Sequence, residues 1–189
     1  MDKPITRRTV LSRRDKLTAD ERRESSVAIA RAVDGLLTSL PAGSIVASYA
    51  PKGSEVATNE LDAFARARGL RVVYPRIVDG DRRLAFHEVA LDELAPSQFG
   101  LLEPLAGAPR VETAEISVFV IPGLAFDRQG WRVGWGRGYY DATLAVAPGA
   151  RRIGIAFECQ LVDEVPRDVH DARLHHVVTE ARVYAGEVD

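Results

Sequence analysis

Residues 121–141 read IPGLAFDRQGWRVGWGRGYYD. These 21 residues hold five of the 15 glycines, both tryptophans and three arginines of the chain. An apolar run over residues 116–121 leads into the stretch, and a helical pattern over residues 139–146 follows it. The pattern predicts a buried strand, then a glycine-rich loop, then the first turns of a helix.

The loop in this stretch combines alternating glycines with arginines. Gly134, Gly136 and Gly138 allow positive φ angles and a close approach of the backbone to a ligand. Amides delivered to the start of a helix bind anions, and the planar guanidinium groups of Arg132 and Arg137 suit phosphate oxygens. We therefore predict a phosphate-binding loop. A glycine-rich surface loop remains an alternative, because the spacing is neither the dinucleotide fingerprint nor the P-loop pattern.

Strands and helices alternate along the rest of the chain. We expect helices that begin near residues 4, 18, 58 and 139, and strands over residues 44–49, 70–74, 84–89, 116–121, 152–157 and 177–184, the last at a sheet edge. Residues 91–110 are interpreted as irregular surface chain, and His87 as a partly exposed strand residue. The predicted fold is a single three-layer α/β/α domain over residues 1–189, with a mainly parallel sheet of five to seven strands.

Length and composition are those of one globular domain. The 189 residues are 46% hydrophobic and 28% charged. A net charge of −2 gives no reason to expect nucleic acid or an anionic membrane as a partner. Cys159 is the only cysteine, which excludes an internal disulfide, and we see neither a secretory leader nor a run long enough to cross a bilayer. We expect a cytoplasmic monomer that acts on small molecules.

Two carboxylates are candidates for ligand contacts. Glu55 follows the strand over residues 44–49, at the sheet edge where ligands gather in open α/β folds, although the residues alone favour a solvated loop carboxylate. Asp141 follows the glycine loop, in a position to share Mg²⁺ with phosphates and water, or to complement a helix terminus. Three histidines late in the chain match no common zinc spacing: His170, His175 and His176.

Residues 122–127 (Pro-Gly-Leu-Ala-Phe-Asp), followed by Gly-x-Arg-x-Gly-x-Gly-x-Gly-Tyr-Tyr-Asp over residues 130–141, closely resemble the signature of the 5-formyltetrahydrofolate cyclo-ligase family. Residues 3–7 are similar to the family's Lys-x-x-Leu-Arg with threonine in place of leucine, residues 55–58 to its Glu-hydrophobic-x-Thr, and residues 100–104 to its Gly-x-x-Glu-Pro. The resemblance implies cyclisation of 5-formyltetrahydrofolate to 5,10-methenyltetrahydrofolate, with ATP as co-substrate and Mg²⁺ as cofactor, and release of ADP and phosphate.

The resemblance also implies roles for individual residues. Those implied in ATP binding are Lys3, Arg7, Arg132, Gly134, Trp135, Gly136, Arg137, Gly138, Tyr139 and Tyr140, with Arg137 and Tyr140 as the catalytic candidates. Those implied in folate binding are Ala50, Glu55, Trp135, Gly136, Arg137, Gly138 and Tyr139. Asp141 and Asp171 are the implied Mg²⁺ ligands. Two other functions stay open: a folate- or nucleotide-binding relative without turnover, and a ligase of the same family with another substrate.

Overall fold

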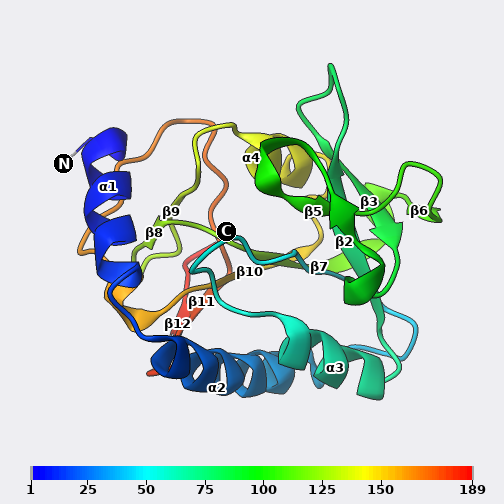
Figure 1. The fold of residues 1–189 in the computed structure, drawn as a ribbon, viewed down its shortest axis with the longest axis horizontal. Helices are drawn as coiled ribbons and strands as arrows, with labels where there is room; N and C mark the ends of the chain where they lie inside the picture. Colours follow the sequence, from blue (N-terminus) through cyan, green and yellow to red (C-terminus); the bar gives the residue numbers. More distant parts are fainter. Residues whose placement is uncertain (1, 189) are drawn as a thin grey trace.

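The computed structural model describes residues 2–188, and its centre is an eight-stranded mixed sheet (Figure 1). Across the sheet the strands are β12 (Val183–Ala185), β11 (His176–Val178), β10 (Arg151–Ile155), β7 (Ile116–Ile121), β1 (Ile45–Ala47), β2 (Arg71–Ile77), β3 (Leu84–Glu88) and β6 (Arg110–Val111). The five strands from β11 to β2 run parallel, and antiparallel strands flank them on both sides. The predicted α/β class with a mainly parallel sheet is confirmed.

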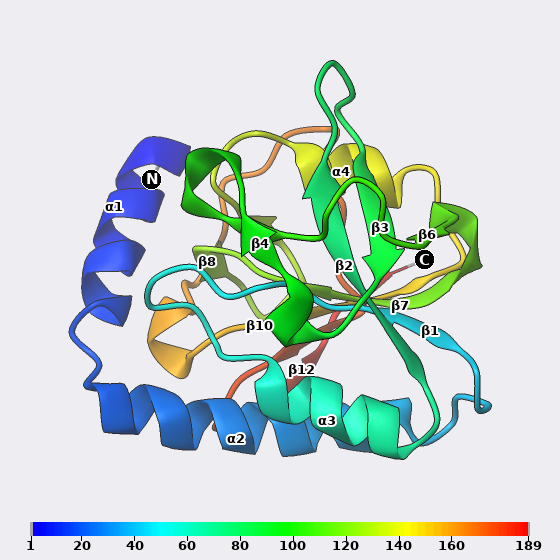
Figure 2. The same cartoon turned by 45° about the vertical axis from the view of Figure 1, so that its right-hand side comes forward.

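Helices cover both faces of the sheet. They are α1 (Lys3–Arg14), α2 (Ala19–Leu37), α3 (Asn59–Ala67) and α4 (Tyr139–Leu144). Both α2 and α3 lie on one face, α4 lies on the other, and α1 stands beside the sheet (Figures 1 and 2). The three predicted layers are therefore present, although one outer layer is a single short helix. None of the helices within residues 2–188 has both the length and the apolar character needed to span a bilayer.

Local sequence explains where the first two helices begin. Asp2 caps α1 by accepting a hydrogen bond from the Ile5 amide at 2.9 Å, and Pro4 lies in the first turn, where its missing N–H costs nothing. At the start of α2 the Thr18 hydroxyl accepts from the Glu21 amide at 3.2 Å, and the Glu21 carboxylate accepts from the Thr18 amide at 2.7 Å. The capping box predicted by this spacing is present.

Each face of the sheet has its own apolar core. Under α2 and α3, side chains such as Ile29, Val33 and Leu61 pack against buried residues of β1, β2 and β7. On the α4 side, Leu144 packs with a second group that includes Phe119. These strands are apolar on both faces because helices cover both sides of the sheet.

The order of the strands places two loops side by side. The chain forms β1, moves outward to β2, and later returns to add β7 on the opposite side of β1. A reversal of this kind leaves a crevice at the carboxyl ends of the two strands, where ligands bind in open α/β sheets. The segment after β1 and the glycine-rich segment after β7 both leave from this edge.

Residues 91–110 depart from the prediction of irregular surface chain. They contain η1 (Leu91–Glu93), β4 (Ala95–Pro96), η2 (Gln98–Gly100) and β5 (Leu102–Glu103), and lead into β6. Glu103 is buried, and its carboxylate accepts a hydrogen bond from the Ile77 amide at 3.2 Å. The segment is therefore anchored to β2. The prediction of five to seven strands is too low, because β6 joins the sheet and residues 177–184 contribute to two strands, β11 and β12.

Two smaller predictions on β2 and β3 are also wrong. Pro75 does not end β2, because β1 pairs only with residues 71–73 and the proline lies beyond that ladder. His87 is buried, not partly exposed, and its Nδ1 lies 2.8 Å from the carbonyl oxygen of Ala108. The remaining short elements are η3 (Thr113–Glu115), β8 (Ala125–Phe126), β9 (Arg132–Val133) and η4 (Glu158–Gln160).

We predict that Gly154→Ala in β10 lowers the free energy of unfolding by about 1–3 kcal/mol, the usual cost of overpacking a core. A Cβ atom there would lie 2.6 Å from Leu174 Cδ1 and 2.7 Å from the Phe126 ring. The matched control is Gly35→Ala on the exposed side of α2, where a Cβ meets nothing within 4 Å and should stabilise the helix by about 0.5–1 kcal/mol. Urea unfolding measures the free energy of unfolding of both variants. Similar changes in the two would contradict the explanation that a Cβ atom at Gly154 overpacks the core.

Candidate active site

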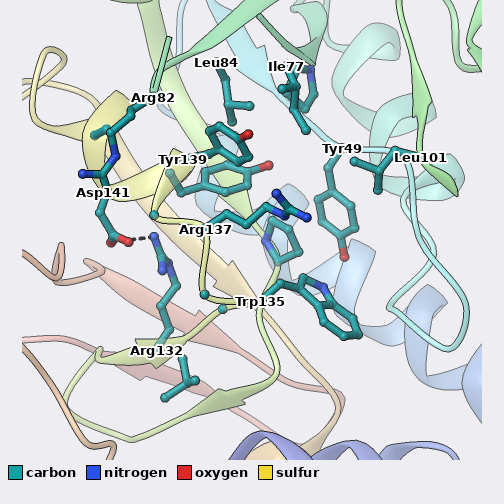
Figure 3. A pocket seen from close by; sticks show the side chains of 18 of the residues that line it. Tyr49, Ile77, Arg82, Leu84, Leu101, Arg132, Trp135, Arg137, Tyr139 and Asp141 are labelled. Atoms are coloured by element: carbon teal, nitrogen blue, oxygen red, sulfur yellow. Dashed lines mark hydrogen bonds and ion pairs between the residues drawn. The ribbon is translucent and has the colours of Figure 1, made fainter. Parts of the chain in front are cut away.

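A cavity of about 1170 Å³ lies at the carboxyl edge of the parallel strands. Its lining comes from α1, the loop after β1, the β2–β3 hairpin, β5, the long segment after β7, α4 and residues 168–171. Figure 3 shows side chains from the loop after β1, the β2–β3 hairpin, the β4–β5 segment, the segment after β7 and α4 around one space. Residues from both ends of the chain therefore meet at the crevice that the strand order predicts.

Every residue predicted as part of the site lies in the lining of this cavity. They are Lys3, Arg7, Ala50, Glu55, Arg132, Gly134, Trp135, Gly136, Arg137, Gly138, Tyr139, Tyr140, Asp141 and Asp171. Lys3 and Arg7 reach it because α1 buries Val10 against Ala125 and Val133 of the β8–β9 hairpin. The placement is a structural fact, whereas the role of each residue stays a prediction.

The glycine loop (residues 134–138) has the backbone that its sequence requires. Gly136 and Gly138 have φ angles of 93° and 69°, in the left-handed region that favours glycine. Arg7 lies against the loop and donates from Nε to the carbonyl oxygen of Gly134 at 2.8 Å. Because α4 has only six residues, the predicted anion binding would depend on the loop and its arginines more than on a helix dipole.

Asp141 is held by two donors. Its Oδ1 lies 2.9 Å from Arg132 Nη2 and 3.1 Å from the amide of Ala172. Arg132 is only 6% exposed, so it needs this carboxylate partner. The Nε atom of Arg132 is buried and has no hydrogen-bond partner among the described residues.

Lys3 joins the other predicted metal ligand to the site. Its Nζ lies 2.6 Å from Asp171 Oδ2 and 2.8 Å from Asp168 Oδ2. Partial burial lowers the pKa of Lys3, but the hydrogen bonds to the two carboxylates outweigh it and raise that pKa overall. The ammonium group therefore keeps its charge beside Asp171.

The two carboxylates fit a magnesium ion that shares phosphate oxygens. The amide that binds Asp141 belongs to Ala172, directly after Asp171, so the two acidic residues lie close together. One oxygen of each, Oδ2 of Asp141 and Oδ1 of Asp171, has no partner within residues 2–188. No group of three or more His, Cys, Asp or Glu side chains in that part of the chain is placed to hold a metal. Mg²⁺ usually takes only one or two carboxylates and completes its shell with phosphate and water.

Glu55 lies on the opposite side of the glycine loop, and the solvated-carboxylate interpretation is wrong. It is 9% exposed, and it accepts hydrogen bonds from the Lys52 amide at 2.9 Å and from Trp135 Nε1 at 3.2 Å. Burial raises the pKa of Glu55, and the two hydrogen bonds only partly oppose that rise. An ionised carboxylate can only accept hydrogen bonds, so any ligand group that paired with Glu55 in that state would have to be a donor.

An apolar wall faces the loop. The side chains that form it come from the segment after β1, from β2 and β3, and from the β4–β5 segment: Tyr49, Pro75, Ile77, Leu84, Leu101 and Leu102. Tyr140 also lines the cavity, and burial, followed by the charge of Glu55, raises the pKa of its phenol. The hydroxyl of Tyr140 therefore keeps its proton at neutral pH and acts as a hydrogen-bonding group, not as a base.

The cavity thus combines a glycine loop, paired carboxylates and an apolar wall, as the resemblance implies. A sequence model of the 5-formyltetrahydrofolate cyclo-ligase family matches residues 1–180. The chain belongs to this family. The match extends through every segment that lines the cavity, from Lys3 to Asp171.

Individual cyclo-ligases agree with this assignment. The 5-formyltetrahydrofolate cyclo-ligase of Mycolicibacterium smegmatis is 35% identical over 161 residues, which are 81% of this chain and 82% of the relative. The solved 5,10-methenyltetrahydrofolate synthetase of Mycoplasma pneumoniae is 26% identical with a TM-score of 0.78, covering 95% of this chain and 99% of that one. The solved 5,10-methenyltetrahydrofolate synthetase of Aquifex aeolicus is 28% identical with a TM-score of 0.78, and the match covers 100% of this chain and 95% of that one.

Several lining residues of this cyclo-ligase were not predicted from the sequence. Arg82 reaches the cavity from the β2–β3 hairpin, and Glu103 from β5. The family-like Gly-x-x-Glu-Pro string at residues 100–104 was a usable signal for Glu103, but its position in an apparently irregular segment concealed it. No local pattern marks Arg82, which is one of several arginines on the surface of the chain. His175, from the histidine group, instead accepts a hydrogen bond from the Arg152 amide at 3.0 Å.

We predict that Glu55→Gln changes how stability depends on pH. Because burial raises the pKa of Glu55, the folded state keeps a proton that the unfolded chain releases above its ordinary pKa of about 4.3. The free energy of unfolding of the wild type should therefore fall, relative to that of the variant, as the pH rises from the pKa of Glu55 in the unfolded chain through its higher pKa in the folded protein. Urea unfolding between pH 4 and pH 7.5 measures this difference.

The control is the same substitution at Glu24, which is exposed on α2. Subtracting the two pH profiles removes the titration of all other groups. A difference between Glu55→Gln and wild type that stays constant over the whole range would mean that the Glu55 carboxylate is not desolvated.

Proposed function

We propose that this cavity binds ATP and 5-formyltetrahydrofolate side by side, and that the residues gathered in it carry out the reaction of the cyclo-ligase family. That reaction converts 5-formyltetrahydrofolate to 5,10-methenyltetrahydrofolate at the expense of ATP. The observation that carries the proposal is the convergence of two ion pairs, Arg132–Asp141 and Lys3–Asp171, beside the glycine loop, with buried Glu55 on the other side of the same cavity.

The two substrates are assigned to different parts of the cavity. The phosphates of ATP belong at the glycine loop, where Lys3, Arg7, Arg132 and Arg137 supply positive charge. The folate belongs against the apolar wall, with its ring N–H groups toward Glu55 and Trp135 at the mouth. The terminal phosphate and the formyl group then meet near the middle of the loop.

The chemistry needs two displacements. The formyl oxygen attacks the terminal phosphorus of ATP, which forms an oxygen–phosphorus bond and breaks the bond to ADP. N10 of the folate then attacks the formyl carbon and loses its proton, and the former formyl oxygen departs within the phosphate. Little covalent participation by the protein is required, so positioning and neutralisation of charge dominate. Arg137 and Arg132 are the groups that neutralise the transferring phosphoryl.

Asp141 and Asp171 would hold Mg²⁺, which neutralises phosphate charge when it is bound. Tyr140, kept protonated by its surroundings, donates a hydrogen bond within the same space. Small-molecule substrates leave no need for a partner protein, and we further propose that the enzyme acts as a monomer in the cytoplasm.

The direct test is to mix the protein with Mg-ATP and 5-formyltetrahydrofolate and to follow the absorbance of the methenyl product. Product should appear only when both substrates are present. Glu55→Gln should raise the KM for folate by roughly 10-fold or more, because a charged hydrogen bond is lost, and leave the KM for ATP unchanged. Folate and ATP binding without product would indicate a binding protein, and turnover of another formylated substrate alone would indicate a different ligase.

We also predict that Asp171→Asn raises the Mg²⁺ concentration for half-maximal rate by at least about 10-fold. Substitution of a residue that only hydrogen-bonds to a metal ligand already lowers metal affinity by about 10- to 100-fold. Asp168→Asn is the matched control, because Asp168 binds the same Lys3 ammonium without being a proposed metal ligand. Its magnesium curve should not move. Equal shifts in both variants would assign the effect to Lys3 and contradict the metal site.

A further inference from the structure

Arg82 is a cationic residue of the cavity to which the cyclo-ligase chemistry described so far assigns no role. It lies at the end of the β2–β3 hairpin, which projects beyond the sheet on the side of α4 (Figures 1 and 2). Its Nη2 lies 3.1 Å from the point that a Cβ atom on Gly138 would occupy. The guanidinium group therefore lies against the backbone of the glycine loop. Arg7 contacts the same loop from α1.

The hairpin is fixed to the loop by hydrogen bonds at its base. The Leu84 amide donates to the Thr143 hydroxyl of α4 at 2.9 Å, and that hydroxyl donates to the Tyr139 carbonyl at 2.7 Å. On the other strand, the Ile77 amide donates to buried Glu103. Arg82 is therefore two residues from an anchor on the helix that begins at Gly138, and its approach to the loop is preorganised.

The charge of Arg82 is not neutralised by the protein. Lys3 is paired with Asp168 and Asp171, and Arg132 with Asp141. Within residues 2–188, the Arg82 guanidinium takes part in no ion pair or hydrogen bond. Its neighbour Arg83 differs, because it binds the Asp81 carboxylate on the outside of the hairpin at 3.1 Å. A planar donor group facing a glycine loop without a protein partner suits a phosphate.

The position of Arg82 in the cavity indicates whether it contacts the nucleotide phosphates or the folate. In Figure 3, Arg82 lies on the same side as Arg132 and Asp141, whereas Tyr49 and Leu101 of the apolar wall lie on the other. Resting on the proposed function, we infer that Arg82 directly contacts a phosphate group of the nucleotide beside Gly138, so that the β2–β3 hairpin contributes an arginine to the reaction. The alternative anion is the glutamyl carboxylate of the folate.

The test compares Arg82→Ala and Arg82→Lys with Arg83→Ala, which removes the same charge from the same hairpin outside the cavity. Arg82→Ala should lower kcat/KM for ATP by about 10- to 150-fold, the usual effect of losing a charged hydrogen bond, and leave the KM for 5-formyltetrahydrofolate unchanged. Arg82→Lys should recover part of the loss, since it restores the charge without the planar fork. Arg83→Ala should behave as wild type. Thermal melts of the three variants exclude a folding defect.

Calorimetric titration with Mg-ATP in the absence of folate separates this inference from the proposed function. Weaker ATP binding by Arg82→Ala would support the phosphate contact even if no methenyl product formed. Identical ATP binding and kinetics in Arg82→Ala and Arg83→Ala would overturn it while turnover by the wild type stood. A rise in the KM for folate alone would overturn it in favour of the glutamyl carboxylate. Failure of the wild type to bind ATP would overturn both.

Discussion

Because β1 pairs in parallel with β2 on one side and with β7 on the other, the segments that leave β1 and β7 emerge next to each other. Each contributes to the cavity: the first holds Glu55, and the second holds the glycine loop and Asp141. Trp135 binds Glu55 across the gap, 80 residues away in sequence. The hydrogen-bond ladder of three short strands thus determines which distant residues can meet.

The charges in the cavity are arranged to be stable before any ligand enters. A buried arginine or carboxylate without a partner is strongly destabilising, so Arg132 and Asp141 must be paired in the ligand-free protein. In the proposed complex the partners are exchanged: the arginine turns to phosphate and the carboxylate to metal. The same holds for Lys3 and Asp171. The ligands therefore replace interactions that already exist, which limits both the desolvation cost and the movement that binding requires.

Much of this site could be predicted from the sequence, because its signals are local. The glycine loop and its arginines are contiguous in residues 130–141, and the capping box at Thr18 needs only four residues. Features set by tertiary contacts were missed. Glu103 is buried because β5 lies against β2, and Pro75 is tolerated because β1 ends before it. Burial and strand length depend on partners that a local pattern does not contain.

The glycines of the loop have a second function besides their positive φ angles. The Arg7 guanidinium carbon lies 3.2 Å from the point that a Cβ on Gly136 would occupy, and Arg82 lies as close to Gly138. A side chain at either position would push the neighbouring guanidinium group away from the loop, so glycine allows this close approach as well as the backbone conformation. The glycine loop, α1 and the β2–β3 hairpin consequently form one unit, although residues 3, 82 and 138 are far apart in sequence. The signature string describes the part of this unit that is contiguous, and the two arginines that close against it come from elsewhere in the fold.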